Sequence, residues 1–125
     1  MSSILIVEDN EKNMKLVRDI LQHKGHATLE ATTGEEGVQL ALAHRPDLIL
    51  MDIQLPGIDG IEALRRIRED DALDAVPVVA ISASVMPDDR RHIVASGFDA
   101  FLTKPISLKP FLAAVERFLK DGRTR

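Results

Sequence analysis

Three short, uninterrupted apolar runs constrain the fold of this chain more than any other feature. Ile4–Val7, Leu48–Met51 and Val78–Ile81 contain no polar position and are rich in branched aliphatic residues. Continuous apolarity predicts strands that are buried on both faces, as in a parallel sheet covered by helices. Each run is far too short to span a bilayer.

Amphipathic segments fill the intervals between these runs and predict helices. Apolar residues recur at helical spacing, and capping residues or glycine stand where a helix would begin or end. The signals are the stripe Met14, Val17, Ile20 and Leu21 stopped by Gly25; the capping boxes Thr33 with Glu36 and Asp59 with Glu62; Pro87 opening a helix that reaches Gly97; and Ser107 before the stripe Phe111, Leu112, Val115, Phe118 and Leu119.

Two weaker strand candidates, Ala27–Ala31 and Ala100–Leu102, complete a strict alternation of five strands and five helices. This alternation predicts one α/β domain with a parallel sheet and right-handed crossovers. A length of 125 residues suits a single domain. We place that domain at residues 1–120 and treat residues 121–125 as a tail.

Polar residues follow the expected strands where the chain leaves the sheet. Glu8 and Asp9 follow the first strand, Asp52 ends the third, Ser82 ends the fourth and Lys104 follows the fifth. Sites in parallel α/β sheets form at this edge. Three carboxylates placed together resist ionising together, and a hard divalent cation such as Mg²⁺ removes the conflict. A phosphoryl donor could then approach, with one carboxylate free to attack phosphorus.

Composition excludes several other kinds of protein. The chain has no cysteine, which rules out disulfides and thiolate metal sites. It also has no tryptophan or tyrosine, so it is poorly equipped to stack on bases or flavins. A net charge of −4 has the wrong sign for nucleic-acid binding. The N-terminus lacks the features of a signal peptide, so we expect a cytoplasmic protein without membrane contact.

Ordinary structural roles remain open for each of these residues taken alone. Asp52 could be a turn residue at a strand end. The Glu8-Asp9-Asn10 stretch could simply cap the first helix. Such roles do not account for all of these residues falling on the same edge of one sheet.

Taken in order along the chain, these residues resemble the receiver domains of two-component response regulators. The matching segments cover essentially the whole sequence: Ile4-Leu-Ile-Val-Glu-Asp-Asn, Asp47-Leu-Ile-Leu-Met-Asp-Ile-Gln-Leu-Pro, Pro77-Val-Val-Ala-Ile-Ser-Ala and Lys104-Pro-Ile. The resemblance implies a flavodoxin-like, doubly wound (βα)5 fold with a five-stranded parallel sheet in the order 2-1-3-4-5.

The resemblance also implies roles for the residues at the sheet edge. Asp52 would be the phosphoacceptor, and Mg²⁺ would be held by Glu8, Asp9, Asp52 and the backbone carbonyl of Gln54. Glu8 stands where the family often has aspartate.

Further roles follow from the same resemblance. Lys104 and Ser82 would contact the phosphoryl group, and the bond between Lys104 and Pro105 would be cis. Phosphorylation would draw in Ser82 and turn Phe101 inward, unless Phe101 is a plain core residue. The family often has tyrosine where this chain has Phe101. Phenylalanine has no hydroxyl, so any signal to a partner would pass through the shape and apolar exposure of its ring.

The activity implied is transfer of a phosphoryl group to Asp52 from a histidine kinase or phosphotransfer protein. The domain would catalyse only its own phosphorylation and dephosphorylation, and would not otherwise be an enzyme. Output would pass to a downstream protein target through the face formed by the helix from Pro87, the fifth strand and the last helix. We expect a monomer or weak dimer.

Several alternatives are weighed against this interpretation. Asn10-Glu-Lys-Asn-Met-Lys-Leu and Lys104-Pro-Ile-Ser resemble stand-alone receivers of the DivK type, but also receivers fused to hybrid histidine kinases that relay phosphate to a phosphotransfer protein. A haloacid-dehalogenase-like phosphatase needs a second acid where this chain has Gln54. A flavodoxin-like electron carrier needs a phosphate loop where Glu8 and Asp9 would repel phosphate.

Overall fold

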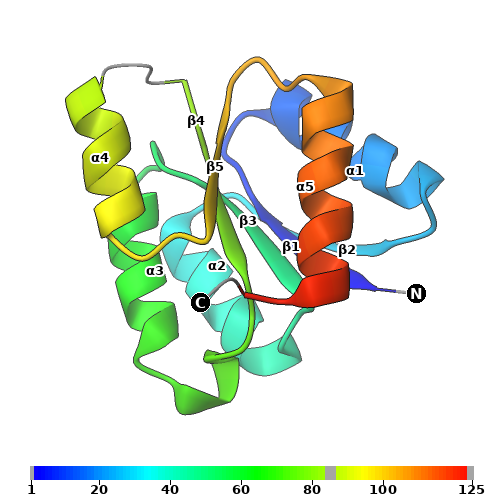
Figure 1. Cartoon of the computed structure of the whole chain (residues 1–125). Helices are drawn as coiled ribbons and strands as arrows, with labels where there is room; N and C mark the ends of the chain where they lie inside the picture. Colours follow the sequence, from blue (N-terminus) through cyan, green and yellow to red (C-terminus); the bar gives the residue numbers. More distant parts are fainter. Residues whose placement is uncertain (1, 84–86, 124–125) are drawn as a thin grey trace.

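The computed structural model describes residues 2–83 and 87–123, which form a five-stranded parallel sheet between two layers of helices (Figure 1). The sheet order is β2-β1-β3-β4-β5, as predicted. The strands are β1 (Ser3–Val7), β2 (Ala27–Ala31), β3 (Leu48–Asp52), β4 (Val78–Ser82) and β5 (Ala100–Thr103). The helices are α1 (Glu11–His23), α2 (Gly34–His44), α3 (Gly60–Arg68), α4 (Pro87–Ala95), α5 (Leu108–Asp121) and the short 3-10 helix η1 (Asp71–Leu73).

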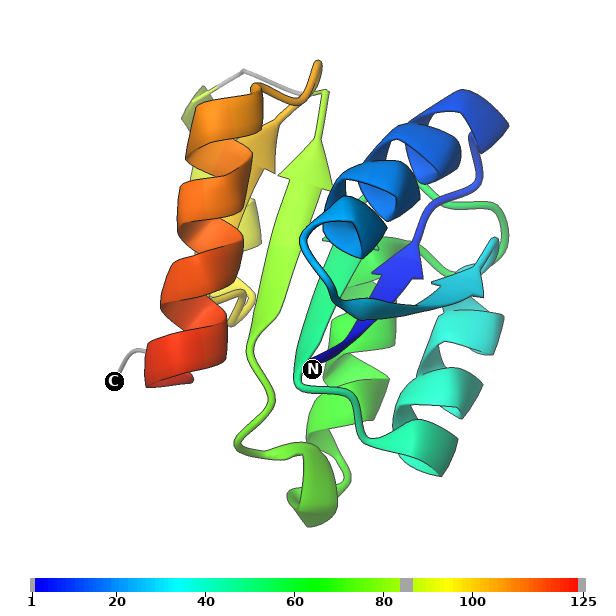
Figure 2. The ribbon, with the colours of Figure 1, turned by 90° about the vertical axis from the view of Figure 1, so that its right-hand side faces the viewer.

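The sheet separates two hydrophobic cores. Helices α1 and α5 cover one face, while α2, α3 and α4 cover the other (Figures 1 and 2). Successive residues of a strand point to opposite faces, so Ile4 and Ile6 pack towards α1 and α5, whereas Leu5 and Val7 pack towards α2 and α3. This division explains why the central strands β1, β3 and β4 are apolar except at one end of each, where Ser3, Asp52 and Ser82 stand. In the described part of the chain, no helix combines the length and apolarity needed to cross a membrane.

Helix α1 ends where the sequence predicts, and Asn10 caps its start. The Asn10 side chain accepts a hydrogen bond from the Asn13 N–H at 3.0 Å. At the other end, Gly25 adopts a φ of 89°, its N–H donates to the Gln22 carbonyl at 3.0 Å, and the next N–H, of His26, donates to Leu21 at 3.1 Å. This pair of bonds is the Schellman motif, in which glycine accepts the left-handed conformation at no steric cost.

The capping boxes form only in part. Thr33 and Asp59 accept hydrogen bonds from the N–H groups of Glu36 and Glu62, at 3.1 and 2.8 Å. The Glu36 carboxylate, however, accepts from the N–H of Thr32 instead of the cap residue, and Glu62 pairs with arginines of its own helix.

The later helices differ slightly from the expected bounds. Helix α4 starts at Pro87 as predicted but ends at Ala95, two residues before Gly97. Ser107 stands at the cap position of α5, but its side chain accepts no capping hydrogen bond from the helix.

The C-terminal segment is tied to the body of the domain. Helix α5 continues through Asp121, one residue into the segment 121–125 that the sequence suggested as a tail. The Arg123 guanidinium lies 3.0 Å from the carboxylate of Asp99 and donates to the Asp74 carbonyl at 2.8 Å. Asp99 is almost fully buried and also pairs with Arg68 at 3.3 Å. Such long-range pairs leave no mark in the local sequence pattern.

Helix α3 begins directly against the end of β3. The Gly60 N–H donates to the carbonyl of Ile53 at 2.9 Å, so the loop between them folds back on itself. A Cβ atom at position 60 would collide with the backbone of Asp52 and lie 2.9 Å from the Cα of Ile53. Only glycine lets α3 start this close to the strand end that carries Asp52.

We therefore expect Gly60→Ala to lower the free energy of unfolding by about 1–3 kcal/mol, the usual cost of overpacking a rigid site. Urea denaturation measures this loss. Gly37→Ala is the matched comparison, because its added methyl would meet the buried Val7 side chain, 2.8 Å from Cγ2, rather than backbone atoms. A loss at Gly60 no larger than at Gly37 would contradict the backbone contact described here.

Candidate functional site

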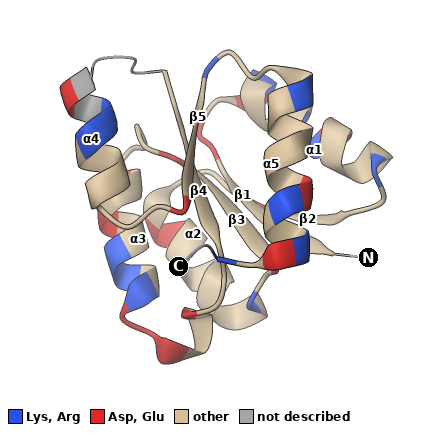
Figure 3. Ribbon diagram, in the orientation of Figure 1, with Lys and Arg blue, Asp and Glu red and all other residues tan. Residues whose placement is uncertain are grey.

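The carboxyl ends of four strands bring the polar residues singled out in the sequence to one edge of the sheet. Asp52 ends β3 and Glu8 directly follows β1; Val7 pairs with Met51 in the register, which sets Glu8 beside Asp52. Ser82 ends β4, and its carbonyl accepts the N–H of Lys104 at 2.9 Å. Figure 3 shows the acidic colour where β1 and β3 end and the basic colour where β5 ends.

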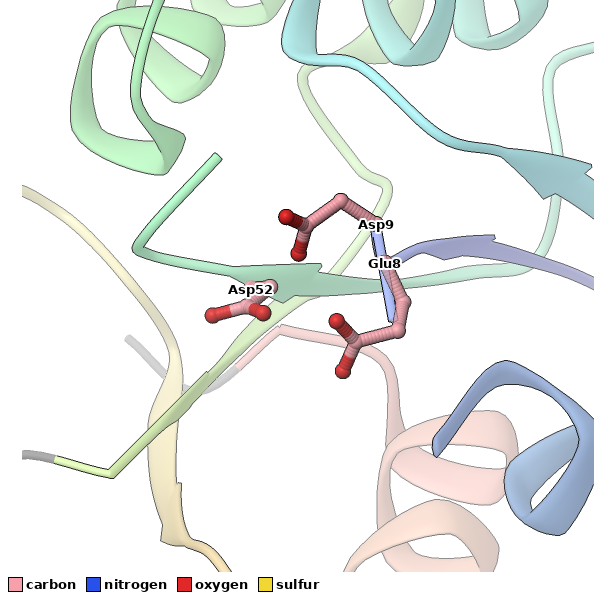
Figure 4. A group of neighbouring side chains, drawn as sticks. All are labelled: Glu8, Asp9 and Asp52. Carbon is pink, nitrogen blue, oxygen red and sulfur yellow. The ribbon is translucent and has the colours of Figure 1, made fainter. Parts of the chain in front are cut away.

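Glu8, Asp9 and Asp52 form a carboxylate cluster, with one oxygen of each within 4.8 Å of the others. Their side chains converge on one point from the ends of β1 and β3 (Figure 4). Glu8 and Asp52 are only 5% and 4% exposed, whereas Asp9 is open to solvent. Oxygen donors in this number suit Mg²⁺, which keeps part of its water shell and therefore needs an open side.

Lys104 balances part of this negative charge. Its Nζ lies 2.8 Å from Oε1 of Glu8 and 2.7 Å from Oδ2 of Asp52. The second oxygen of each carboxylate accepts a backbone hydrogen bond at 3.1 Å, from Asn10 for Glu8 and from Gln54 for Asp52. One ammonium group facing three carboxylates leaves a formal charge of −2, which a divalent cation would cancel.

The environment shifts two of the pKa values in the site. Burial and hydrogen bonding with Asp52 raise the pKa of Glu8 above its ordinary value, against the opposing effects of Lys104 and Asn10. Burial alone would lower the pKa of Lys104, but its hydrogen bonds with Asp52 and Glu8 prevail and raise it. Lys104 therefore stays cationic, while Glu8 holds its proton to a higher pH than an exposed glutamate does.

The remaining predicted residues lie around this cluster. Ser82 is buried at the end of β4, and the peptide bond between Lys104 and Pro105 is cis, as the resemblance implied. Gln54 approaches Asp52 through its backbone N–H. The metal and phosphoryl roles of these residues stay predictions.

Phe101 lies apart from the cluster, on β5 beside α4. It is half-buried and packs against the core on the α2–α3 side. The Arg90 guanidinium stands 5.3 Å from the centre of its ring, and both line a groove of about 250 Å³ between α4, β5 and α5. Sequence spacing gave no sign of the Arg90 contact, because it joins two elements that only the fold brings together.

Comparisons with known proteins agree with this geometry. The family described as "Response regulator receiver domain" matches residues 4–116. A Brucella anthropi protein named polar-differentiation response regulator DivK is 44% identical over 120 residues, which cover 96% of this chain and 98% of that protein. A Brucella ovis protein of the same name is 43% identical.

A solved structure shows a closely similar receiver fold. The receiver domain of a sensor histidine kinase from Pseudomonas aeruginosa superposes with a TM-score of 0.90 at 31% identity, covering 96% of this chain and 98% of that one. That structure has a magnesium ion coordinated in its active-site cleft. A CheY-like protein from Methanospirillum hungatei, 23% identical with a TM-score of 0.88, shares the fold.

We expect Lys104→Met to destabilise the metal-free protein at pH 7 by about 2 kcal/mol, less than the full cost of breaking a deeply buried ion pair because the side chain is 19% exposed. The loss should shrink near pH 4, since protonation relieves the repulsion between the carboxylates left behind. Urea denaturation at both pH values in EDTA measures it.

Arg65→Gln is the control for this measurement. Arg65 pairs with Glu62 and Glu69 on the exposed face of α3, where ion pairs contribute little. A Lys104→Met protein as stable as this control, or equally destabilised at both pH values, would show that Lys104 does not neutralise the cluster.

Proposed function

The chain belongs to the response regulator receiver domain family, and from this premise we propose that it accepts a phosphoryl group on Asp52 and signals by contact with other proteins. The observation that supports this most is the setting of Asp52 at a buried strand end, beside two further carboxylates and 2.7 Å from the Lys104 ammonium. A carboxylate fixed at a buried strand end beside an ammonium group is well placed to attack phosphorus as a nucleophile.

In the proposed reaction, an Asp52 carboxylate oxygen attacks phosphorus of a phosphohistidine. The bond from phosphorus to the histidine nitrogen breaks as the new O–P bond forms, and the imidazole leaves with the electron pair. The Lys104 ammonium moves onto a phosphoryl oxygen, and the Ser82 hydroxyl donates to another. When bound, Mg²⁺ supplies the charge that lets the phosphoryl group approach three carboxylates. Water later attacks phosphorus, which releases inorganic phosphate and regenerates Asp52.

We assign the metal ligands to Glu8, Asp9 and Asp52, with the backbone carbonyl of Gln54 as a further donor. The closeness of the three carboxylates and their unbalanced charge support this assignment. A magnesium ion in the cleft of the Pseudomonas aeruginosa receiver domain supports it further. Neutrality then requires one divalent cation, because the three acids and Lys104 leave a charge of −2.

The output surface proposed is the face made by α4, β5 and α5. Phe101 pairs with Ala80 and Ser82 with Thr103, so Ser82 and Phe101 lie two register positions apart on the adjacent strands β4 and β5. We propose that Phe101 turns inward when the Ser82 hydroxyl shifts towards phosphate. Phe101 has only its shape and apolar surface to offer a partner, and it lies in the groove that Arg90 helps to line. We propose that output passes to a downstream protein at this face.

The phosphoryl donor is a histidine kinase or a phosphotransfer protein. Relatives named DivK, matched over nearly their full length, favour a response regulator whose receiver acts as a separate protein. The likeness to the receiver of a sensor histidine kinase favours the alternative of a relay within a hybrid kinase.

We expect Asp52→Asn to abolish labelling when the protein is incubated with a phosphorylated histidine kinase and Mg²⁺, because the amide is not nucleophilic. Transfer of radiolabelled phosphate measures this. Asp59→Asn is the matched control: it makes the same change in an exposed residue, and asparagine still caps α3. Equal labelling of wild type and Asp52→Asn would refute the assignment of Asp52.

We further expect the affinity for Mg²⁺ to rise with pH from the ordinary glutamate value of 4.5 upwards. The folded-state pKa of Glu8 is raised, so a proton occupies that carboxylate over a wider range and must leave before the metal binds. The gain approaches about tenfold per pH unit where one proton is released per ion. Isothermal titration calorimetry with Mg²⁺ measures it, and Glu8→Gln should flatten the dependence. Affinity that is unchanged with pH above 4.5 would exclude Glu8 from the metal site.

A further inference from the structure

The loop between β3 and α3, residues 53–59, presses against the first turn of α2. Gly34 is buried there, and a Cβ atom at its position would lie 2.6 Å from Cγ1 and 2.7 Å from the carbonyl oxygen of Ile58. At the adjoining positions, a Cβ atom on Gly57 would lie 2.6 Å from Oε2 of Glu35. Two glycines, one in the helix and one in the loop, therefore allow a closer approach than residues with a Cβ would permit.

This loop carries Gln54, whose backbone N–H donates to Oδ1 of Asp52 at 3.1 Å. At its β3 end the loop is anchored by Ile53, whose carbonyl accepts the N–H of Gly60 at 2.9 Å. Gln54 stands between this anchor and the contact with Gly34. Because the loop is short, a displacement at Gly34 is passed on to the Gln54 amide and to its hydrogen bond with Asp52.

The start of α2 is also joined to the end of β1. Ala31 is the last residue of β2, and its carbonyl accepts the N–H of Glu8 at 2.9 Å. Two residues separate Ala31 from Gly34 in the chain. One short segment, residues 31–35, therefore meets both the end of β1 and the loop that follows β3. It links the backbones on either side of the carboxylate cluster.

We propose that Gly34 is a positioning residue for the Asp52 site: by letting the loop sit directly on α2, it fixes the Gln54 backbone and with it the orientation of the Asp52 carboxylate. A larger residue at position 34 would push the loop outward, because it would meet both the carbonyl and the core-packed side chain of Ile58. Asp52 would then lose a hydrogen bond that orients it. The Gln54 carbonyl belongs to the same stretch of loop, so its role as a metal donor rests on the proposed function.

Amide hydrogen exchange of the metal-free protein tests this positioning role. In Gly34→Ala, we expect the Gln54 amide to exchange about tenfold faster, since overpacking by one methyl group costs enough to shift a local opening equilibrium by that factor. The Asn10 amide is the internal reference, because it makes the equivalent bond to Oε2 of Glu8 at 3.1 Å from a different loop. A Gln54 amide that exchanges as in wild type, or an equal acceleration at Asn10, would overturn the proposal.

Gly37→Ala is the matched comparison in the same helix. Its Cβ would lie 2.8 Å from Cγ2 of Val7, so it crowds α2 against β1 rather than against the loop. Both substitutions should lower the stability measured in urea, whereas only Gly34→Ala should loosen Gln54. If Gly37→Ala loosens Gln54 to the same degree, crowding of α2 in general is the cause and the assignment to Gly34 is wrong.

Ile58→Ala changes the same contact from the loop side, and it decides the question if Gly34→Ala does not fold by circular dichroism. It removes the Cγ1 and Cδ1 atoms that face Gly34 and should also speed exchange of the Gln54 amide. Ile61→Ala is its control, because Ile61 is likewise half-buried and packed against the same core but lies within α3. Equal exchange at Gln54 in these two variants would contradict the role of the contact.

Calorimetric titration with Mg²⁺ separates this inference from the proposed function. The dissociation constant of Gly34→Ala should be about tenfold above that of wild type, while that of Gly37→Ala stays near the wild-type value. A wild type that binds no Mg²⁺ and takes up no phosphoryl group, with Gln54 loosened in Gly34→Ala, would refute the proposed function and leave the positioning of Gln54 standing. Equally tight binding of Mg²⁺ by wild type and Gly34→Ala would overturn this inference and leave the proposed function intact.

Discussion

The Lys104 ammonium group is the interaction on which the site depends, because it joins strands that are not neighbours in the sheet. Lys104 follows β5, yet its Nζ contacts carboxylates at the ends of β1 and β3, on the far side of β4. Without this cation, two almost fully buried carboxylates would face each other and one would have to take up a proton. The position of Lys104 therefore decides how much negative charge the edge of the sheet can hold.

The two ends of the sheet handle buried carboxylate charge in opposite ways. At the other end, Asp99 lies between two guanidinium groups, those of Arg68 and Arg123, and accepts the N–H of Val78. One acid with two cations is fully compensated and holds β5 and the C-terminal segment in place. Three acids with one cation are not compensated, and this surplus of negative charge supports the proposal that a metal binds at the Asp52 end.

Rigid packing beneath the site keeps the Lys104 ammonium close to the carboxylates of Glu8 and Asp52. Each central strand contributes alternate side chains to two separate cores, so neither β1 nor β3 can slide without disturbing both. Gly60 adds a constraint from the side, since it lets α3 press against the backbone that carries Asp52. The two residues proposed to move on phosphorylation, Ser82 and Phe101, belong to β4 and β5 instead, on the half of the sheet next to α4.

Local pattern was enough to predict the strands, the helices and the gathering of Glu8, Asp9, Asp52 and Lys104 at one edge. Apolar runs and capping residues act within a few positions of the chain, and parallel strands always bring their carboxyl ends together. Only the tertiary structure decided which partners those side chains meet: the sharing of Lys104 between Glu8 and Asp52, the Arg90 contact with Phe101, and the Arg123 pair with Asp99. These contacts join residues far apart in sequence, and their distances depend on side-chain length and strand register, which no local pattern records.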